Sequence, residues 1–211
     1  MSRSASQTKQ HILAQAQFLF AENGLDGVSV REIAQRSQIN VALISHYFGG
    51  KKGLYEACVE SMYQQISTFQ PQVLFGITPP NSLSKQLHLL IAEAFEFACT
   101  HKMALLLIQR DILAHGQLAP QKRKKHFEPF IAQLIRFFPH LHETPLRLGV
   151  QSLIFLITRY ALCPKDELRQ IAPAYQQHEL IAHLSSLAHH IFQIPQDPCL
   201  LSISPKNRPQ N

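Results

Sequence analysis

Residues 39–55 read INVALISHYFGGKKGLY, in which a short apolar segment runs into an aromatic cluster and is followed by glycines and lysines. Asn40 suits the N-cap of a helix, because its side chain can accept a hydrogen bond from the first turn. Gly49-Gly50 breaks the chain after the aromatic residues. This order predicts a short helix over 41–47 and a longer helix over 51–66.

The residues before this stretch predict two further helices. Apolar side chains recur at helical spacing over 12–20, and Asn23-Gly24 suits a left-handed cap at the end of that helix. Ser29 and Glu32 have the spacing of a capping box, in which each side chain bonds the backbone of the other residue. Two short capped helices joined by a tight turn, with a third helix before them, are typical of a helix-turn-helix.

The helical step of about 100° per residue assigns the faces of the helix over 41–47. With Ile44 at the centre of the inward side, Ala42, Ser45 and His46 fall outward. This outward face is small and polar, so it can lie against base edges without steric conflict. We expect Val41, Tyr47 and Phe48 on the inward side and Leu43 on the flank.

The glycine pair and the lysines predict a phosphate site. Gly49-Gly50 exposes backbone amides at the start of the next helix, where Lys51 adds a positive charge, and amides with lysine make a clamp for phosphate. Lys52 opposes the helix dipole in the first turn, where an acidic residue is more favourable. That cost is explained if a phosphate lies nearby.

The spacing across residues 11–58 resembles the DNA-binding domain of the TetR (tetracycline-repressor) family. The resemblance implies an all-α protein with an N-terminal three-helix DNA-binding head and a divergent helical bundle that binds a ligand and dimerises. The matching positions are mainly apolar or turn residues: Ile12-Leu13, Ala16, Leu19-Phe20-Ala21, Gly24, Gly27, Ser29, Ile33-Ala34, Ile44, Tyr47-Phe48, Lys51 and Leu54-Tyr55.

The resemblance also implies which residues contact DNA. Three positions depart from the family pattern: Gln38 replaces a turn glycine and is strained if its φ is positive, Leu43 replaces a small hydroxyl residue, and Lys52 replaces an acid. The operator sequence therefore does not carry over from relatives. The predicted DNA-binding residues are Ser29 and Arg31 on the second helix, Val41, Ala42, Ser45 and His46 as base readers, and Tyr47, Lys51 and Lys52 near phosphates.

Beyond residue 60 the resemblance is architectural only. Turn residues and prolines divide the rest of the chain into expected helices over 82–100, 102–115, 121–138, 145–162 and 176–193. We expect three regions: a DNA-binding domain over 1–56, a helical ligand-binding and dimerisation domain over 57–194, and a loose tail over 195–211.

Two segments of the bundle, 147–162 and 179–192, are apolar around more than half their circumference and are expected to pack on two sides. The resemblance places the dimer interface there, so a charged residue at position 156 should disrupt it; the alternative is a core within one chain. Apolar residues with a few polar ones predict an inducer pocket before these segments. Its candidate residues are Phe75, Leu90, Phe97, His101, Met103, Leu107 and Arg110.

Composition limits the classes of protein that this chain can be. The 211 residues are 45% hydrophobic and 16% charged, which can fill a core and argues against a disordered chain. The formal net charge of +6 favours a polyanionic partner, nucleic acid before an anionic membrane. The basic run 122–125 is interpreted as a solvated helix face or loop rather than a second nucleic-acid site.

Cysteine spacing and hydropathy indicate a cytoplasmic protein with no membrane partner. Cys58, Cys99, Cys163 and Cys199 are far apart and form no CxxC pair, which argues against a disulfide framework or a zinc site. The N-terminus is polar, and the longest strongly apolar run, 103–108, is too short to cross a bilayer.

The sequence predicts no enzyme, no cofactor and no metal site. HELIAH, residues 178–183, differs from the zinc-protease motif because its two histidines stand five residues apart rather than four. Nucleophile-elbow, P-loop and Rossmann motifs are absent from the sequence.

We therefore expect a transcriptional regulator whose partners are a double-stranded DNA operator, a second copy of the chain and an unidentified small-molecule inducer. That it represses rather than activates follows from the resemblance alone. The alternative is a helical interaction module that uses the head surface for protein contacts. Such a module should show no salt-dependent affinity for DNA.

Overall fold

The computed structural model describes residues 5–69, 71, 83–117, 119–139, 141–173 and 176–195. Every regular element in these ranges is an α-helix, so the predicted all-α fold is confirmed. The chain divides into two compact units. Unit 1 contains residues 1–69 and 100–130, and unit 2 contains residues 70–99 and 131–211.

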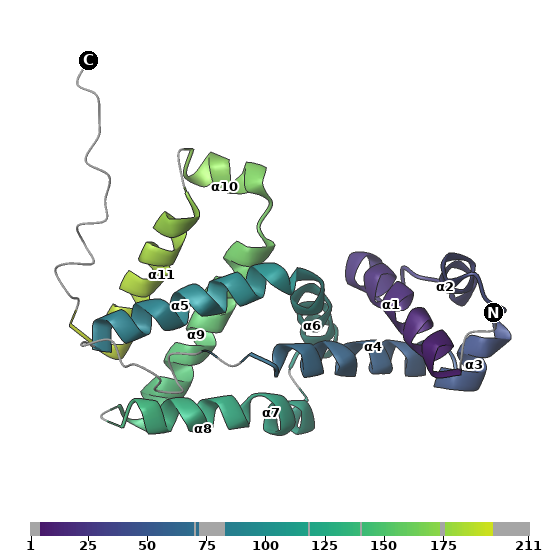
Figure 1. Cartoon of the computed structure of the whole chain (residues 1–211), viewed down its shortest axis with the longest axis horizontal. Helices are drawn as coiled ribbons and strands as arrows, with labels where there is room; N and C mark the ends of the chain where they lie inside the picture. Colours follow the sequence, from purple (N-terminus) through teal and green to yellow (C-terminus); the bar gives the residue numbers. More distant parts are fainter. Residues whose placement is uncertain are drawn as a thin grey trace, which may run out of the picture. The chain divides into compact units, whose positions relative to one another are not determined.

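Unit 1 combines the helix-turn-helix with later helices. Helices α1 and α3 pack against α4, α2 packs against α1, and α6 packs against both α1 and α4 (Figure 1). Ile12, Ile44 and Leu54 are fully buried in the shared core, and Leu107 of α6 completes it. The bounds are α1 Ala5–Asn23, α2 Val30–Ser37, α3 Ala42–Phe48, α4 Lys51–Ile66, α6 Lys102–His115 and α7 Pro120–His126.

Unit 2 is built mainly on the packing of α9 against α11. A Cβ atom at Gly149 of α9 would lie 2.5 Å from Cε1 of Phe192 and 2.6 Å from Cγ2 of Ile191, so the close approach of the two helices requires glycine. The Phe192 ring also stacks on Phe138, with ring centroids 6.2 Å apart. The bounds are α5 Leu83–Thr100, α8 Glu128–Phe137, α9 Glu143–Leu162, α10 Lys165–Ile171 and α11 Gln177–Phe192.

Two expectations about the helices are wrong. The single helix expected over 121–138 is two helices, because α7 ends at His126 and α8 begins at Glu128. Pro129 explains the break, since it has no N–H to donate to the Lys125 carbonyl four residues earlier. Helix α10 was not expected, although Pro164 at its N-cap and two acidic residues in its first turn are typical of a helix start. The predicted region boundary at 56/57 stays a prediction.

The C-terminus of α1 is completed by a residue far along the chain. Gly24, with φ +73°, donates its N–H to the Phe20 carbonyl at 2.9 Å. Arg110 of α6 supplies the next two bonds, from Nε to the Ala21 carbonyl and from Nη2 to the Glu22 carbonyl, both at 2.7 Å. The guanidinium therefore satisfies carbonyls that have no partner within α1 and places positive charge at the negative end of the helix dipole.

Hydropathy gives one finding about membranes. Across the described ranges, no single helix combines the length and apolar character of a membrane span; α9 and α10, bent by 111° at their junction, pass only when taken as a pair.

Two histidines join α5 to α11 in unit 2. His189 Nδ1 lies 2.6 Å from the Ser185 carbonyl, which can only accept, so Nδ1 carries the proton and Nε2 can accept from the Ser84 hydroxyl at 2.7 Å. His88 Nδ1 lies 3.0 Å from Ser185 Oγ, whose own proton is directed to the Ile181 carbonyl at 2.7 Å. His88 Nδ1 therefore donates to Ser185 Oγ, and the two rings tie α5 to α11.

The environment of His88 predicts acid sensitivity. Burial, reinforced by the nearby His189, lowers the pKa of His88, so the unfolded chain binds this proton more readily than the folded chain. Stability should be complete above about pH 6.5, the ordinary histidine pKa, and should fall as the pH drops below it. Urea unfolding followed by circular dichroism between neutral and mildly acidic pH measures this. His88→Gln should flatten the profile, whereas His142→Gln, at an exposed histidine, should not; equal profiles would contradict the assignment.

Candidate nucleic-acid interface

The capping box at the start of α2 is confirmed. Ser29 Oγ accepts from the Glu32 N–H at 3.1 Å, and the Ser29 N–H donates to Glu32 Oε2 at 3.4 Å. The serine hydroxyl thus acts as an acceptor within the cap and keeps its own proton for another partner. Arg31 is exposed in the first turn of the same helix. The cap therefore presents one hydroxyl donor and one guanidinium at the start of α2.

The turn between α2 and α3 meets the condition under which the sequence predicts strain at Gln38. Gln38 is in the left-handed region, with φ 54° and ψ 46°, a conformation that costs a non-glycine residue about 1–2 kcal/mol. Its N–H and that of Ile39 bond back to carbonyls at the end of α2, at 3.1 Å to Gln35 and 3.0 Å to Ala34. This closed turn fixes the direction in which α3 leaves α2.

The faces of α3 agree with prediction except at one residue. Ile44 is fully buried, and Ala42, Ser45 and His46 are exposed. Val41 was expected to point inward, but its side chain is 38% exposed. Val41 is the N-cap of α3 and has helical backbone angles, and the preceding Asn40 accepts a hydrogen bond from the Ala42 N–H at 2.9 Å. Exposure of Val41 adds an apolar group, suited to a thymine methyl, to the outward face.

An aromatic series closes the back of α3. The His46 and Tyr47 rings meet edge to face with centroids 5.0 Å apart, and Tyr47 meets Phe48 in the same way at 6.4 Å. Tyr47 and Phe48 are half-buried against the core of unit 1. These contacts hold the exposed imidazole of His46 against a fixed neighbour.

The start of α4 has the form of an anion site. Gly49 and Gly50 have φ of +72° and +108°, and an added Cβ would meet nothing within 4 Å at either, so glycine is required by backbone conformation rather than by crowding. Helix α4 begins at Lys51 without a side-chain cap and with no acidic residue in its first turn. Its first amides therefore remain directed toward solvent, and Lys51 and Lys52 stand beside them.

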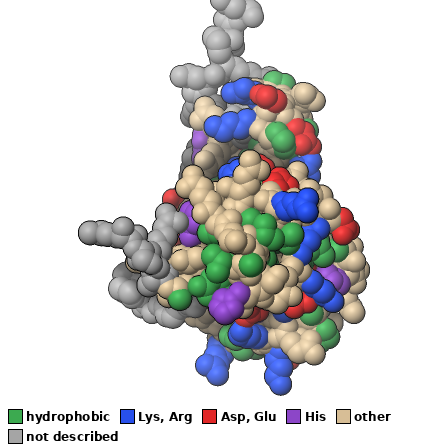
Figure 2. Space-filling model, turned by 90° about the vertical axis from the view of Figure 1, so that its right-hand side faces the viewer, with side chains coloured by type: hydrophobic (Ala, Val, Ile, Leu, Met, Phe, Trp, Pro, Cys, Tyr) green, Lys and Arg blue, Asp and Glu red, His purple; other side chains and the backbone are tan. Residues whose placement is uncertain are grey.

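Positive charge also projects from this end of unit 1. Figure 2 shows the molecule from the side on which Figure 1 draws α3, and blue Lys and Arg side chains stand out from the surface there. Arg31 and Lys52 are exposed and Lys51 is half-exposed, and they lie on the helices that precede and follow α3 in the chain. The surface therefore combines a reading face with cations beside it, which is the division of roles found in protein–DNA interfaces.

The predicted pocket residues are distributed over both units. Phe75 lies outside the described residues, Leu90 and Phe97 belong to α5 in unit 2, and the others belong to unit 1. A hollow of about 450 Å³ lies between α9, α10 and α11, and none of the predicted residues is among those lining it. Within unit 1, Leu107 is fully buried in the core, Met103 is 36% exposed and Arg110 bonds to α1, while His101 is the N-cap of α6. The inducer pocket stays a prediction.

Sequence reasoning missed two contacts at the head. Arg110 reaches α1 across about 90 positions, and no local pattern predicts such a contact. Lys9 of α1 lies over the Phe48 ring, with Nζ 5.6 Å from the centroid. In the sequence, the only sign of this contact is a lone lysine before the apolar face of α1, and a lone lysine does not predict a ring contact.

Comparison with known proteins agrees with this geometry. The model of the family described as "Bacterial regulatory proteins, tetR family" matches residues 12–58. "Probable HTH-type transcriptional regulator YttP" of Bacillus subtilis is 32% identical over 130 residues, which are 61% of this chain and 62% of that protein. "HTH-type transcriptional repressor NicS" of Pseudomonas putida is 21% identical over 115 residues, 54% of this chain and 53% of that protein.

Solved structures extend the likeness to the whole fold. A TetR-like transcriptional regulator from Rhodococcus sp. RHA1 has 17% identity and a TM-score of 0.64, over 92% of this chain and all of that chain. The TetR-family regulator PfmR from Thermus thermophilus has 18% identity and a TM-score of 0.56, over 86% and 97% of the two chains. The chain spans less than two thirds of the length of the curated relatives named above.

Proposed function

We propose that this chain, whose residues 12–58 match the tetR family of bacterial regulatory proteins, is a member of that family, represses transcription from a pseudo-palindromic operator and is released by a small-molecule inducer. The family consists of DNA-binding regulators of the helix-turn-helix type and not of enzymes, in agreement with the sequence prediction. Repression is supported by the resemblance and by the likeness to NicS, whose name describes a repressor.

One observation carries the proposal: the outward face of α3 stands beside the uncapped start of α4. Exposed Ala42, Ser45 and His46 are small or polar and suit base edges in a major groove. The free amides of α4 with Lys51 suit a phosphate of the adjacent backbone. A surface for protein contacts would not need two glycines with positive φ at a helix start that lacks an acid.

A homodimer through α9 and α11 is supported by the apolar side chains that α9 leaves exposed. Leu148 is 66% exposed and Phe155 is 63% exposed. With exposed Ser152 and Arg159 they follow the spacing i, i+4, i+7, i+11, which places all four on one face of α9. In a two-fold dimer such a face meets its own copy, and the two heads would read half-sites about 34–36 Å apart.

The inducer would act by changing the separation of the two heads. Helix α4 carries both the phosphate clamp at its start and, further along, the contacts with α6 and α7. A ligand that moves α4 in both protomers would alter the spacing of the reading faces. Coupling must be reciprocal, so operator DNA should weaken inducer binding by the factor by which inducer weakens DNA binding.

Two substitutions test the proposed division of roles. His46→Ala should alter sequence preference, costing about 1–3 kcal/mol at one or two operator positions, because His46 is proposed to contact bases. Lys51→Ala should weaken all sequences about equally and reduce the slope of log affinity against log salt by about 0.9 per lost phosphate contact. Fluorescence anisotropy over a salt series measures both, with a duplex selected from a random library by this protein and its scrambled version.

Specific results would contradict each of these expectations. An unchanged slope for Lys51→Ala would remove the phosphate contact, and equal losses on selected and scrambled DNA would remove base reading by His46. If the unaltered protein shows no salt-dependent affinity for either duplex, the helical interaction module is the better account.

A further inference from the structure

The N-terminal helix holds a cation at the edge of the reading head. Lys9 lies in the second turn of α1, and its ammonium is 5.6 Å from the centre of the Phe48 ring. Phe48 ends α3 and directly precedes the glycine pair that opens α4. The N-terminal end of α1 accordingly lies beside α3 (Figure 1). A positive charge from α1 is thus held next to the uncapped start of α4.

The ammonium of Lys9 keeps its hydrogen-bonding capacity. Lys9 is exposed, and in the described part of the chain its one recorded contact is with the Phe48 ring, whose π face accepts no ordinary hydrogen bond. A lysine ammonium has three donors, so all three remain available to an anion. Contact with the ring restricts the side chain without neutralising its charge.

Arg36, in the same unit, is a cation whose contacts are structural, and it differs from Lys9. Its guanidinium stacks on the Phe18 ring at 4.3 Å, and Nε donates to Gln15 Oε1 at 2.9 Å. Arg36 therefore joins α2 to α1 with both a stacking contact and a hydrogen bond. Lys9 has the ring contact alone, and its partner Phe48 is a residue of the reading helix.

We propose that Lys9 contacts a backbone phosphate of duplex DNA and that the Phe48 ring positions its ammonium beside the start of α4. This inference rests on the proposed DNA binding and adds a contact residue to it. The contact reads charge and not sequence, because phosphates are the same at every base pair. The ring also gives Phe48 a role beyond closing the core.

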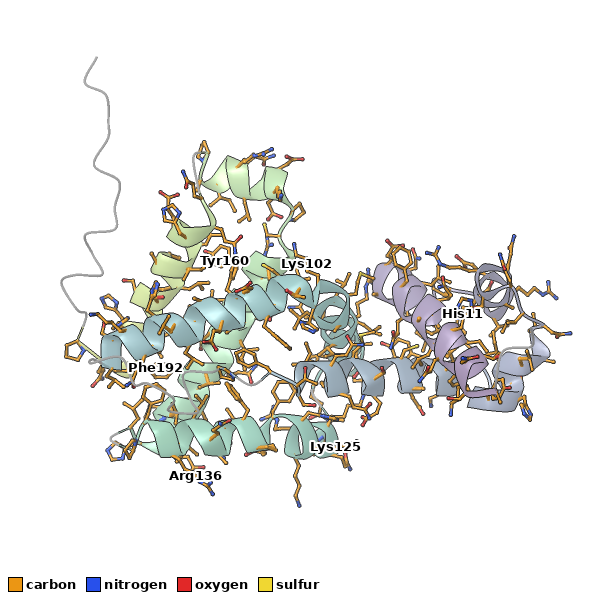
Figure 3. The ribbon with its side chains drawn as sticks, viewed as in Figure 1. His11, Lys102, Lys125, Arg136, Tyr160 and Phe192 are labelled. Atoms are coloured by element: carbon orange, nitrogen blue, oxygen red, sulfur yellow. The ribbon has the colours of Figure 1, made fainter. Side chains whose placement is uncertain are left out.

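The first test removes the charge of Lys9 and compares the loss of DNA affinity with that caused by removing the charge of a distant lysine. Lys9→Gln should reduce the slope of log affinity against log salt by about 0.9 per protomer bound, which corresponds to about eightfold weaker binding at 0.1 M salt when affinities converge at 1 M. The matched control is Lys102→Gln, at an exposed lysine that starts α6 away from α3 (Figure 3). Lys9→Arg should retain the slope.

The second test isolates the role of the ring. Phe48→Leu keeps apolar bulk. It should weaken binding to a short random-sequence duplex, the DNA used in both tests, when Lys9 is present, but it should weaken binding little further in the Lys9→Gln variant. This non-additivity is the signature of a coupled pair. Circular dichroism melting of each variant shows whether the head remains folded.

The results separate this inference from the proposed function. If the unaltered protein binds DNA but Lys9→Gln leaves the slope unchanged, or Lys102→Gln reduces it equally, the phosphate contact is wrong while the function stands. If Phe48→Leu weakens both backgrounds equally, positioning by the ring is wrong. Failure of the unaltered protein to bind any duplex would overturn the proposed function and the inference with it.

Discussion

Replacing Phe155 with glutamate is expected to convert the proposed dimer into monomers at micromolar concentration. Phe155 is 63% exposed within one protomer, so in the proposed dimer its ring would contribute to association rather than to the protomer core. Burial of such a ring contributes about 1.5–3 kcal/mol, and a two-fold interface loses it twice, about 3–6 kcal/mol in all. This corresponds to roughly a hundredfold to ten-thousandfold weaker association. Sedimentation equilibrium over a concentration series measures the change.

A matched substitution makes the dimer test specific. Leu113→Glu introduces the same charge at a side chain that is 81% exposed on α6 of unit 1, and it should leave the association state unchanged. Leu156, the position that the sequence suggests, is half-buried within the protomer, so a charge there would damage folding as well. A stable monomer for the unaltered protein, or a Phe155→Glu dimer of unchanged affinity, would remove the proposed interface.

Replacing Arg110 with methionine is expected to lower the free energy of unfolding by about 2–4 kcal/mol. A hydrogen bond to a charged group contributes about 1.5–3 kcal/mol, which applies to the part-buried bond to Ala21, and the exposed bond to Glu22 contributes less. Methionine keeps much of the side-chain length but cannot donate to the Ala21 and Glu22 carbonyls at the end of α1. The melting temperature should fall by about 2–4 °C for each kcal/mol in a chain of this size.

The control for Arg110 is Arg123→Met on α7, where the cation is exposed and the expected change is within about 0.5 kcal/mol. Arg110 was a candidate pocket residue, and the measurement distinguishes the two roles. A residue that only contacts inducer would leave the unfolding transition of the ligand-free protein in place. An unchanged transition for Arg110→Met would therefore argue against the capping role.

Local sequence signals predicted the head in detail because its conformation is set by neighbours in the chain. The capping box of Ser29 and the chain break at Gly49-Gly50 are confirmed, and Gln38 has the positive φ under which strain is expected. Each depends on residues within a few positions. The assignment of faces on α3 failed at Val41, the N-cap, although its backbone is helical.

Contacts over long sequence separation could not be predicted in the same way. Neither the bonds from Arg110 to α1 nor the ring contact of Lys9 leaves a periodic pattern. The break between α7 and α8 is different, because Pro129 was a local signal and the apolar periodicity over 121–138 concealed it. The role of each DNA-contacting residue stays a prediction, since the fold shows which side chains are exposed and not which atoms of DNA they meet.

The sharing of one core by α6 and the head limits how modular this regulator is. A fragment that stops at residue 58 includes the whole family match, yet it lacks Ala104, Leu107 and Arg110. Its apolar interior would be open on one side, and the last carbonyls of α1 would meet only water. Exchange of heads between relatives should therefore succeed only when α6 is transferred as well. On the ribosome, the head is made first but reaches its final stability only after α6 has emerged.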